Sequence, residues 1–261
     1  MLNYIRRMKQ IPNLFTLLNL VFGCLAIVFI LQTGESIVLL GDTGFTQVAL
    51  PEKITWGCLC IFAAGIIDFL DGFVARLFKA HSEMGKQLDS LADLVSFGVA
   101  PGMILFQLLR ISYAQEAGGL DVSIGWLLPS LLIPCAAAWR LARFNLDSGQ
   151  EYSFKGLPAP SAGLAIASIP LIIWYPSFGI QAYLINKWVL YAVILLLSYL
   201  MVSRLPLMSL KVTDYSLRNN LPRYILLVIG IVMAIWLKWL AIPVILLAYV
   251  VLSLTLKNKS A

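Results

Sequence analysis

The sequence predicts an all-α protein, a polytopic membrane helix bundle with about eight transmembrane helices. Hydrophobic residues make up 60% of the 261 residues and charged residues only 12%, against about 25% charged in a soluble domain. The mean hydropathy of +0.87 excludes an ordinary soluble enzyme, a disordered chain and a small disulfide scaffold. The apolar runs are continuous, whereas a membrane β-barrel needs alternating strands of about 10 residues. Helices therefore remain, because they satisfy their own backbone hydrogen bonds in lipid.

Eight apolar runs have lengths that suit a bilayer core of about 30 Å, which takes roughly 20 helical residues. Only Lys238 and its neighbours separate the last two runs. These two runs form either a tight hairpin, which gives eight spans, or a single element, which gives seven. In chain order the runs lie near 14–33, 54–79, 88–112, 124–145, 157–177, 183–203, 221–237 and 239–256.

Basic residues divide unequally between the two sets of helix ends. Of the 19 Lys and Arg residues, 15 fall at one set of ends, and the opposite set holds only Lys53, Arg110, Lys187 and Lys238. The positive-inside rule makes the basic set cytoplasmic. We therefore expect a protein integral to the cell membrane, with both termini in the cytoplasm and an even number of spans. Anionic lipid headgroups explain the net charge of +6, so no nucleic-acid partner is expected.

Four carboxylates lie in this apolar sequence: Asp68, Asp71, Asp89 and Asp93. A carboxylate at membrane depth is costly and usually faces a polar cavity. At about 100° per residue, Asp68 and Asp71 share one helix stripe with two small residues. The two later acids share another stripe if their helix starts near Ser82. Two helices joined by a short connection thus bring four carboxylates, with a charge of about −4, close together. This predicts a divalent-cation site.

Oxygen-only ligands favour hard cations, so we expect Mg²⁺ or Mn²⁺, with Ca²⁺ as a further candidate. A cation transporter is the alternative from another functional class, because acids within a membrane also mark ion paths. Such a transporter commonly has repeat symmetry or interrupted helices in matching halves, and the sequence shows neither.

Together these residues read DxxDGxxAR from Asp68 to Arg76, followed by GxxxDxxxD from Gly85 through Asp89 to Asp93. This pattern resembles the signature of the CDP-alcohol phosphatidyltransferase family at every defined position. Four further stretches are similar to the phosphatidylserine synthase branch of that family. They are IPNLFTLLN from Ile11, LDSLADLVSFGVAP from Leu88, RLARFN from Arg140 and FKGLPAP from Phe154.

The resemblance implies a fold, a reaction and an assembly. It implies a CDP-alcohol phosphatidyltransferase-like bundle that moves the phosphatidyl group of CDP-diacylglycerol to L-serine, with release of CMP. Glycerol 3-phosphate or an inositol (phosphate) is the alternative acceptor. The implied protein is a single membrane domain over 1–261, with a catalytic core over about 11–203 and a C-terminal helical hairpin over about 221–256. A homodimer with two metal ions per site is also implied.

The resemblance also implies residue roles. Asp68, Asp71, Asp89 and Asp93 resemble metal ligands, and Asp93 also resembles the proton acceptor. The residues that resemble contacts to CDP-diacylglycerol are Asn13, Thr16, Asp68, Gly72, Ala75, Arg76 and Ser82.

Five residues are candidates for binding the serine acceptor: Ser96, Arg140, Arg143, Asn145 and Lys155. An Arg side chain can hold a carboxylate through two parallel hydrogen bonds. The serine or asparagine could bind the ammonium or the hydroxyl. For the three cations the alternative is that they only follow the positive-inside rule.

Overall fold

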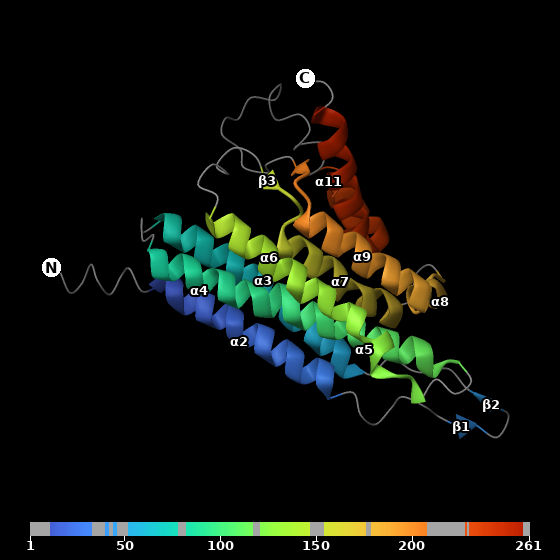
Figure 1. The fold of residues 1–261 in the computed structure, drawn as a ribbon. Helices are drawn as coiled ribbons and strands as arrows, with labels where there is room; N and C mark the ends of the chain where they lie inside the picture. The colour runs from blue at the N-terminus through green and yellow to red at the C-terminus, as the bar shows by residue number, and fades with distance from the viewer. Residues whose placement is uncertain are drawn as a thin grey trace.

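The computed structural model describes residues 11–32, 40–41, 44–45, 52–77, 82–116, 121–146, 154–175, 179–207, 228 and 230–257. Within these ranges the chain is helical apart from short connections and four two-residue strands. Figure 1 shows the long helices packed side by side, with the C-terminal helix inclined to them.

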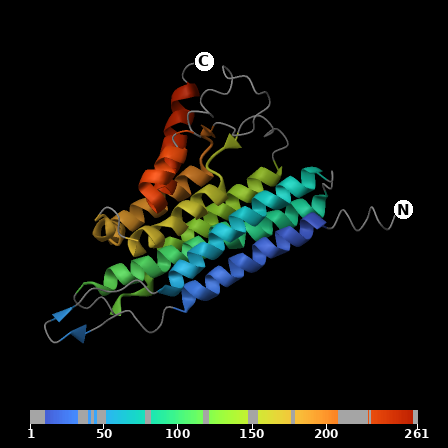
Figure 2. The same cartoon turned by 180° about the vertical axis from the view of Figure 1, so that it is seen from behind.

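The N-terminal half supplies three long helical segments. They are α2 (Ile11–Leu31), α3 (Glu52–Leu77) and a continuous segment made of α4 (Glu83–Asp93), the π-helix η1 (Leu94–Val99) and α5 (Ala100–Ala114). Ser82 caps α4, because its Oγ accepts a hydrogen bond from the backbone N–H of Gly85 at 3.0 Å. The predicted helix start near Ser82 is therefore confirmed. Helix α2 packs against both α3 and α4, and Figure 2 shows α2 beside α3.

The middle of the chain begins with tighter turns than expected. The predicted span at 124–145 starts as two 3₁₀ segments, η3 (Ile124–Trp126) and η4 (Leu128–Leu131), and becomes α6 only over Leu132–Leu146. Pro129 stands at the start of η4, where its missing N–H costs no helical hydrogen bond. The following helices are α7 (Ala159–Trp174), α8 (Gln181–Leu184) and α9 (Lys187–Val202).

Two small antiparallel pairs complete the connections. Strand β1 (Leu40–Gly41) pairs with β2 (Gly44–Phe45), and β3 (Phe154–Lys155) pairs with β4 (Pro206–Leu207). Gly156 follows β3 with φ of 81°, and its N–H donates to the carbonyl of Leu205 at 2.8 Å. This contact ties the chain before α7 to the segment after α9.

The C-terminal part reverses direction at Lys238, which has φ of 50°. Residues 230–237 are helical, η5 (Lys238–Leu240) follows, and α11 spans Ala241–Lys257. A Cβ placed on Gly230 would lie 3.8 Å from Cδ1 of Ile245. On one straight helix these residues would be roughly 22 Å apart, so the two pieces fold back on each other.

Pro12–Leu31, Lys53–Leu77 and Glu83–Ala114 are each long and apolar enough to cross a membrane. Gly230–Ser253 also has sufficient length and apolar composition, but it turns back at Lys238. Helices α7 and α9 are apolar but have 16 residues each. The described chain is therefore a helix bundle of the predicted class, with segments that suit a membrane by length and composition. The count of eight spans stays a prediction, and so does the division into a core and a C-terminal hairpin, because residues 221–227 lie outside the description.

Small residues let the helices approach closely around η1. A Cβ on Gly163 of α7 would lie 2.9 Å from the Cα of Phe97, and one on Gly98 would lie 3.0 Å from the Cβ of Ala137. The Phe97 side chain is fully buried. This is the small-residue packing typical of membrane helices, and it makes η1 the centre of the bundle.

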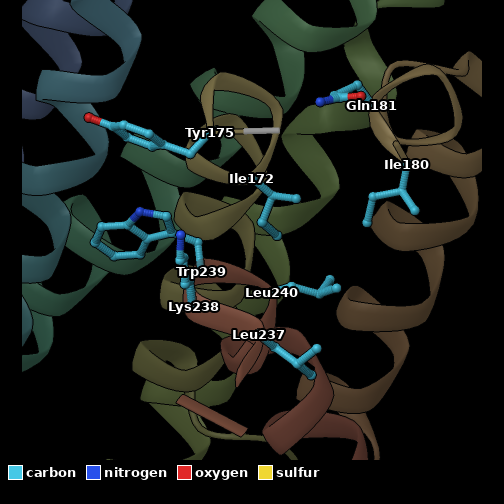
Figure 3. A pocket seen from close by; sticks show the side chains of 8 residues that line it. All are labelled: Ile172, Tyr175, Ile180, Gln181, Leu237, Lys238, Trp239 and Leu240. Atoms are coloured by element: carbon cyan, nitrogen blue, oxygen red, sulfur yellow. The ribbon is translucent and has the colours of Figure 1, made fainter. Parts of the chain in front are cut away.

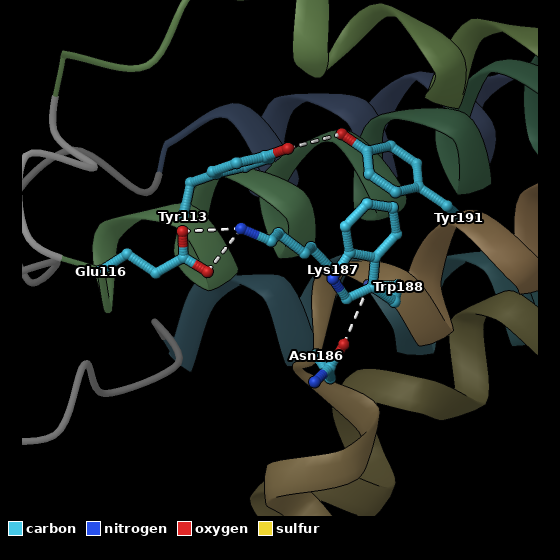
Figure 4. A network of polar contacts seen from close by, with 6 residues as sticks. All are labelled: Tyr113, Glu116, Asn186, Lys187, Trp188 and Tyr191. Carbon is cyan, nitrogen blue, oxygen red and sulfur yellow. Dashed lines mark hydrogen bonds and ion pairs between the residues drawn. The ribbon is translucent and has the colours of Figure 1, made fainter.

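A polar cluster joins the end of α5 to the start of α9 (Figure 4), at the end of the bundle that carries β1 and β2 in Figure 1. Lys187 Nζ lies 2.6 Å from Glu116 Oε1, and the hydroxyls of Tyr113 and Tyr191 are 3.0 Å apart. The Tyr191 hydroxyl also donates to the carbonyl of Trp126 at 2.6 Å. These contacts connect helix ends at the end of the bundle opposite Asp68 and Asp71.

Candidate functional site

The predicted acidic stripe of α3 opens into a cleft of about 820 Å³. Asp68, Asp71, Gly72 and Ala75 all line it, as their spacing on one helix face predicts. The other walls come from α2 and the start of α4. The complete lining is Pro12, Asn13, Thr16, Asp68, Phe69, Asp71, Gly72, Ala75, Arg76, Ser82, Glu83, Gly85, Lys86 and Asp89.

Three carboxylates meet in this cleft. One oxygen each of Asp68, Asp71 and Asp89 lies within 4.8 Å of the other two. Asp71 is buried and the other two are half-buried. Thr16 Oγ1 lies 2.9 Å from Asp71 Oδ2 and can donate to it, so α2 fixes the orientation of an α3 carboxylate.

The donor set fits a hard divalent cation. All the converging atoms are carboxylate oxygens, which Mg²⁺, Mn²⁺ and Ca²⁺ prefer. In addition, Asp89 Oδ1 is buried and has no hydrogen-bond partner among the described residues. Buried polar atoms are normally paired, so this oxygen is suited to accept a ligand.

Asp93 lies deeper than the other three acids and is not part of the three-carboxylate group. Its side chain is 7% exposed, and its Oδ1 accepts a hydrogen bond of 3.3 Å from Asn19 Nδ2. It also interacts with the side chain of Asp68. The predicted proton acceptor thus lies beside the three-carboxylate group but is more enclosed.

The residues predicted to contact the nucleotide end of a substrate all line the cleft. A Cβ on Gly72 would meet no atom within 4 Å, so the space above this residue is open. Arg76 Nε donates to the carbonyl of Gly72 at 3.0 Å, which leaves its other guanidinium nitrogens available at the cleft wall. Asn13 and Ala75 complete this set, and Ser82 also caps α4.

One of the acceptor candidates, Arg140, is a buried cation. It is 8% exposed and lies within electrostatic reach of Asp93 and Tyr249. Its Nε is buried and unpaired within the described part of the chain. The guanidinium carbon also lies 6.0 Å from the ring centroid of Phe144.

Two other candidates make contacts between helices. Arg143 Nη1 donates to the carbonyl of Val202 at 2.8 Å, at the end of α9. Asn145 Nδ2 donates to Ser90 Oγ at 2.9 Å, and its backbone oxygen accepts from Lys86 Nζ at 3.0 Å. These contacts join α6 to α9 and α6 to α4.

The remaining two acceptor candidates differ in what the structure describes. Ser96 is fully buried, and its hydroxyl donates to the carbonyl of Asn19 at 3.1 Å. Lys155 lies in β3, and its side chain is outside the described part of the structure. None of the five acceptor candidates is among the described residues that line the cleft.

Sequence reasoning did not assign a role to Asn19 or to Lys86. Lys86 lies one helical turn before Ser90 and lines the cleft, so the cleft has two cationic side chains, Arg76 and Lys86. Because Lys86 directly follows Gly85 of the motif, the sequence could have identified it as a residue of the site. Asn19 ends the IPNLFTLLN stretch, but its contact with Asp93, 74 residues away, depends on tertiary packing.

A second hollow does not compete with this cleft as a ligand site. It measures about 10 Å³, room for about one water molecule. Figure 3 shows its lining, which comes from the end of α7, the start of α8 and the turn at residues 237–240.

Comparison with known proteins agrees with the geometry. A relative from Mycobacterium leprae is 36% identical over 173 residues, which are 63% of this chain and 53% of the relative. One from Bacillus subtilis is 30% identical over 69% of this chain and 89% of the relative. One from Mycobacterium tuberculosis is 30% identical over 93% of this chain and 76% of the relative. Each is named CDP-diacylglycerol–serine O-phosphatidyltransferase.

These comparisons extend the similarity beyond the stretches found by motif. The chain spans about half the length of the Mycobacterium leprae relative. The match to the Mycobacterium tuberculosis relative reaches into the C-terminal third, which the motifs do not cover. The model of the CDP-alcohol phosphatidyltransferase family matches residues 9–200. Since these residues form most of the chain and include the whole described lining of the cleft, the chain belongs to the CDP-alcohol phosphatidyltransferase family.

Proposed function

We propose that the protein transfers the phosphatidyl group of CDP-diacylglycerol to L-serine, giving phosphatidylserine and CMP. The observation that carries this proposal is the cleft itself. Seven of the eight family-motif residues, all except Asp93, line one hollow at the ends of membrane-length helices. The names of the relatives support serine as the acceptor.

The shape and charge of the cleft suit a nucleotide-activated lipid. Its volume of about 820 Å³ lies in the range of small-molecule sites, roughly 300–1,000 Å³. Arg76 and Lys86 supply positive charge for a diphosphate, and Gly72 lets the ligand approach the α3 backbone. Phe69 is exposed on the same helix, where acyl chains can remain in the lipid.

Asp68, Asp71 and Asp89 would hold the divalent cation, Mg²⁺ or Mn²⁺, and Asp93 would complete the ligand set. When bound, such a cation neutralises charge on the diphosphate and on the leaving CMP. Thr16 keeps Asp71 oriented for this role. A pair of cations per site and a homodimeric assembly belong to the same proposal.

Asp93 serves as the proton acceptor of the proposed reaction. The serine hydroxyl is a poor nucleophile at neutral pH, so a nearby carboxylate must take its proton. The serine oxygen forms a bond to the β-phosphorus as the bond from that phosphorus to the CMP oxygen breaks. The proton goes to Asp93. We favour direct attack because the remaining acids are committed to the cation.

Arg140 is our preferred contact for the serine carboxylate. It is the candidate that combines burial, an unpaired Nε within the described structure and proximity to Asp93. The contacts of Arg143 and Asn145 already have a structural use in joining helices.

The site end of the bundle should face the cytoplasm. Among the described cations, Arg76 and Lys86 line the cleft. Lys86 also donates to the end of α6, and Arg143 there donates to the carbonyl of Val202 at the end of α9, two residues before Arg204. On the basis of the positive-inside rule we propose that the cleft and both termini face the cytoplasm.

An acceptor panel tests the proposal. Purified protein in detergent receives CDP-diacylglycerol and Mn²⁺, and serine, glycerol 3-phosphate, inositol or inositol phosphate is added singly while CMP release is measured. We expect CMP release when serine is added and none with the other three acceptors. Release only with another acceptor would keep the family chemistry and overturn the serine assignment. No release from folded, metal-binding protein would overturn the enzyme proposal in favour of cation transport.

A further inference from the structure

One turn of α2, from Asn19 to Gly23, contacts both the end of α4 and the π-helix that follows it. Asn19 Nδ2 donates to Asp93 Oδ1 at 3.3 Å. The backbone oxygen of the same residue accepts the Ser96 hydroxyl at 3.1 Å. Asn19 and Ser96 are both fully buried. A single residue of α2 therefore contacts Asp93 through its side chain and η1 through its backbone.

The backbones must approach closely for these contacts to form. A Cβ on Gly23 would overlap Ser96 Oγ and lie 2.9 Å from the Ser96 Cα. On the other sides of η1, Gly163 and Ala137 pack against Phe97 and Gly98. The segment directly after Asp93 is thus held from α2, α6 and α7, and packed interiors resist displacement.

The Asn19 amide carries a cost that packing does not explain. With Nδ2 directed at the carboxylate, its Oδ1 is buried without a hydrogen-bond partner among the residues described. An unpaired buried oxygen costs free energy, and an apolar side chain of the same shape would avoid this cost. The amide is therefore best explained by its action on Asp93.

We propose that Asn19 is a positioning residue for the proton acceptor. It holds one oxygen of Asp93 in place, so that the second oxygen can take the proton of the attacking hydroxyl. Ser96 anchors Asn19 from η1, so its role is to support the site rather than to bind serine. This inference rests on the proposed function, in which Asp93 accepts that proton.

The test compares Asn19→Leu with the matched variant Gln107→Leu. Gln107 is also a buried amide on the third helical segment that bonds to α2, with its Nε2 3.3 Å from the carbonyl of Ile30. We expect Asn19→Leu to lower kcat by about 100-fold, the scale of a misplacement of about 1 Å. The KM for CDP-diacylglycerol should stay within about twofold, because the residues that line the cleft are unchanged. Mn²⁺ affinity should fall less than kcat, because the three converging carboxylates are also unchanged and only Asp93 is displaced. Gln107→Leu should keep wild-type kcat.

The outcomes separate this inference from the function beneath it. If the wild-type protein shows no acceptor-dependent CMP release, the proposed function is wrong. An active wild type with full kcat in Asn19→Leu would overturn only the positioning role, as would equal losses of kcat, substrate affinity and Mn²⁺ affinity. If Asn19→Leu fails to fold, Asn19→Ala removes the same amide without adding bulk and is judged by the same criteria.

Discussion

At the scale of single residues, the cleft depends on which positions carry a side chain and which do not. Gly72 leaves open space over α3, while Thr16 reaches across from α2 to Asp71. One residue provides room for a ligand and the other fixes a carboxylate.

Replacing Gly72 by Leu should fill part of the cleft. A side chain there meets no atom within 4 Å of its Cβ. Leu is also a better helix former than Gly, which is about 0.8–1.0 kcal/mol less favourable than Ala in a helix interior. We therefore expect the KM for CDP-diacylglycerol to rise at least about tenfold, the equivalent of 1.4 kcal/mol, with no loss of thermal stability. Steady-state kinetics and thermal unfolding in detergent measure the two effects. A lower melting temperature with unchanged KM would contradict this role for Gly72.

Asp89→Asn should weaken cation binding, because it removes one charge from a group of three carboxylates. We expect Mn²⁺ affinity to fall at least about tenfold, about 1.4 kcal/mol, and chelation of the wild type to remove an activity that Mg²⁺ or Mn²⁺ restores. Titration with Mn²⁺ measures the affinity. Asp121→Asn, at the opposite end, is the control and should bind Mn²⁺ as the wild type does.

The acidic group could be predicted from the sequence because it is local. Spacings of three and four residues place side chains on one helix face whatever the helix packs against, and Asp68, Asp71 and Asp89 do converge. The environment of Asp93 could not be predicted in this way. Its partner Asn19 is distant in the chain, and the packing of α2 against α4 brings the two together.

At the scale of elements, the helices were more predictable than their breaks. Hydropathy predicts where apolar runs lie. Helix α3 begins and ends two residues before the expected run at 54–79, and α9 begins four residues after and ends one residue before the ends of the expected run at 183–203. The 3₁₀ start before α6 and the π-helix at Leu94–Val99 have the same apolar composition as α-helix. Neighbouring helices decide such local geometry, so hydropathy alone does not reveal it.

The connection from β3 to α7 should be sensitive to a single methyl group. Gly156 has φ of 81°, and a Cβ there would lie 2.7 Å from the carbonyl oxygen of Ser203. We expect Gly156→Ala to destabilise the fold by about 1–3 kcal/mol, because it adds backbone strain and a collision. Thermal unfolding in detergent measures this loss.

Gly179→Ala is the matched control for that collision. Gly179 also has positive φ, 65°, but an added Cβ would meet nothing within 4 Å. Gly179→Ala should lower the stability of the fold by less than Gly156→Ala does, since only the backbone conformation is strained. Equal losses in the two variants would show that the contact with the end of α9 adds nothing.

At the scale of the whole molecule, the bundle is polarised between an end with the acidic cleft and an end with the Lys187–Glu116 pair. The polarity predicts an orientation in the membrane. In a cysteine-free background, Asp121→Cys should react with an impermeant maleimide on intact cells, and Arg204→Cys only after lysis. Both residues are exposed in the structure. Labelling of position 204 on intact cells would contradict a cytoplasmic cleft.

The most direct measurement of the central claim is the ratio of phosphatidylserine formed to CMP released, in the wild type and in Asp93→Asn. We expect one phosphatidylserine for each CMP in the wild type, with Mn²⁺ and serine present. Asp93→Asn should form neither product, while it still binds CDP-diacylglycerol. CMP release without serine, or the same turnover in Asp93→Asn, would contradict the claim that this cleft carries out phosphatidyl transfer to serine.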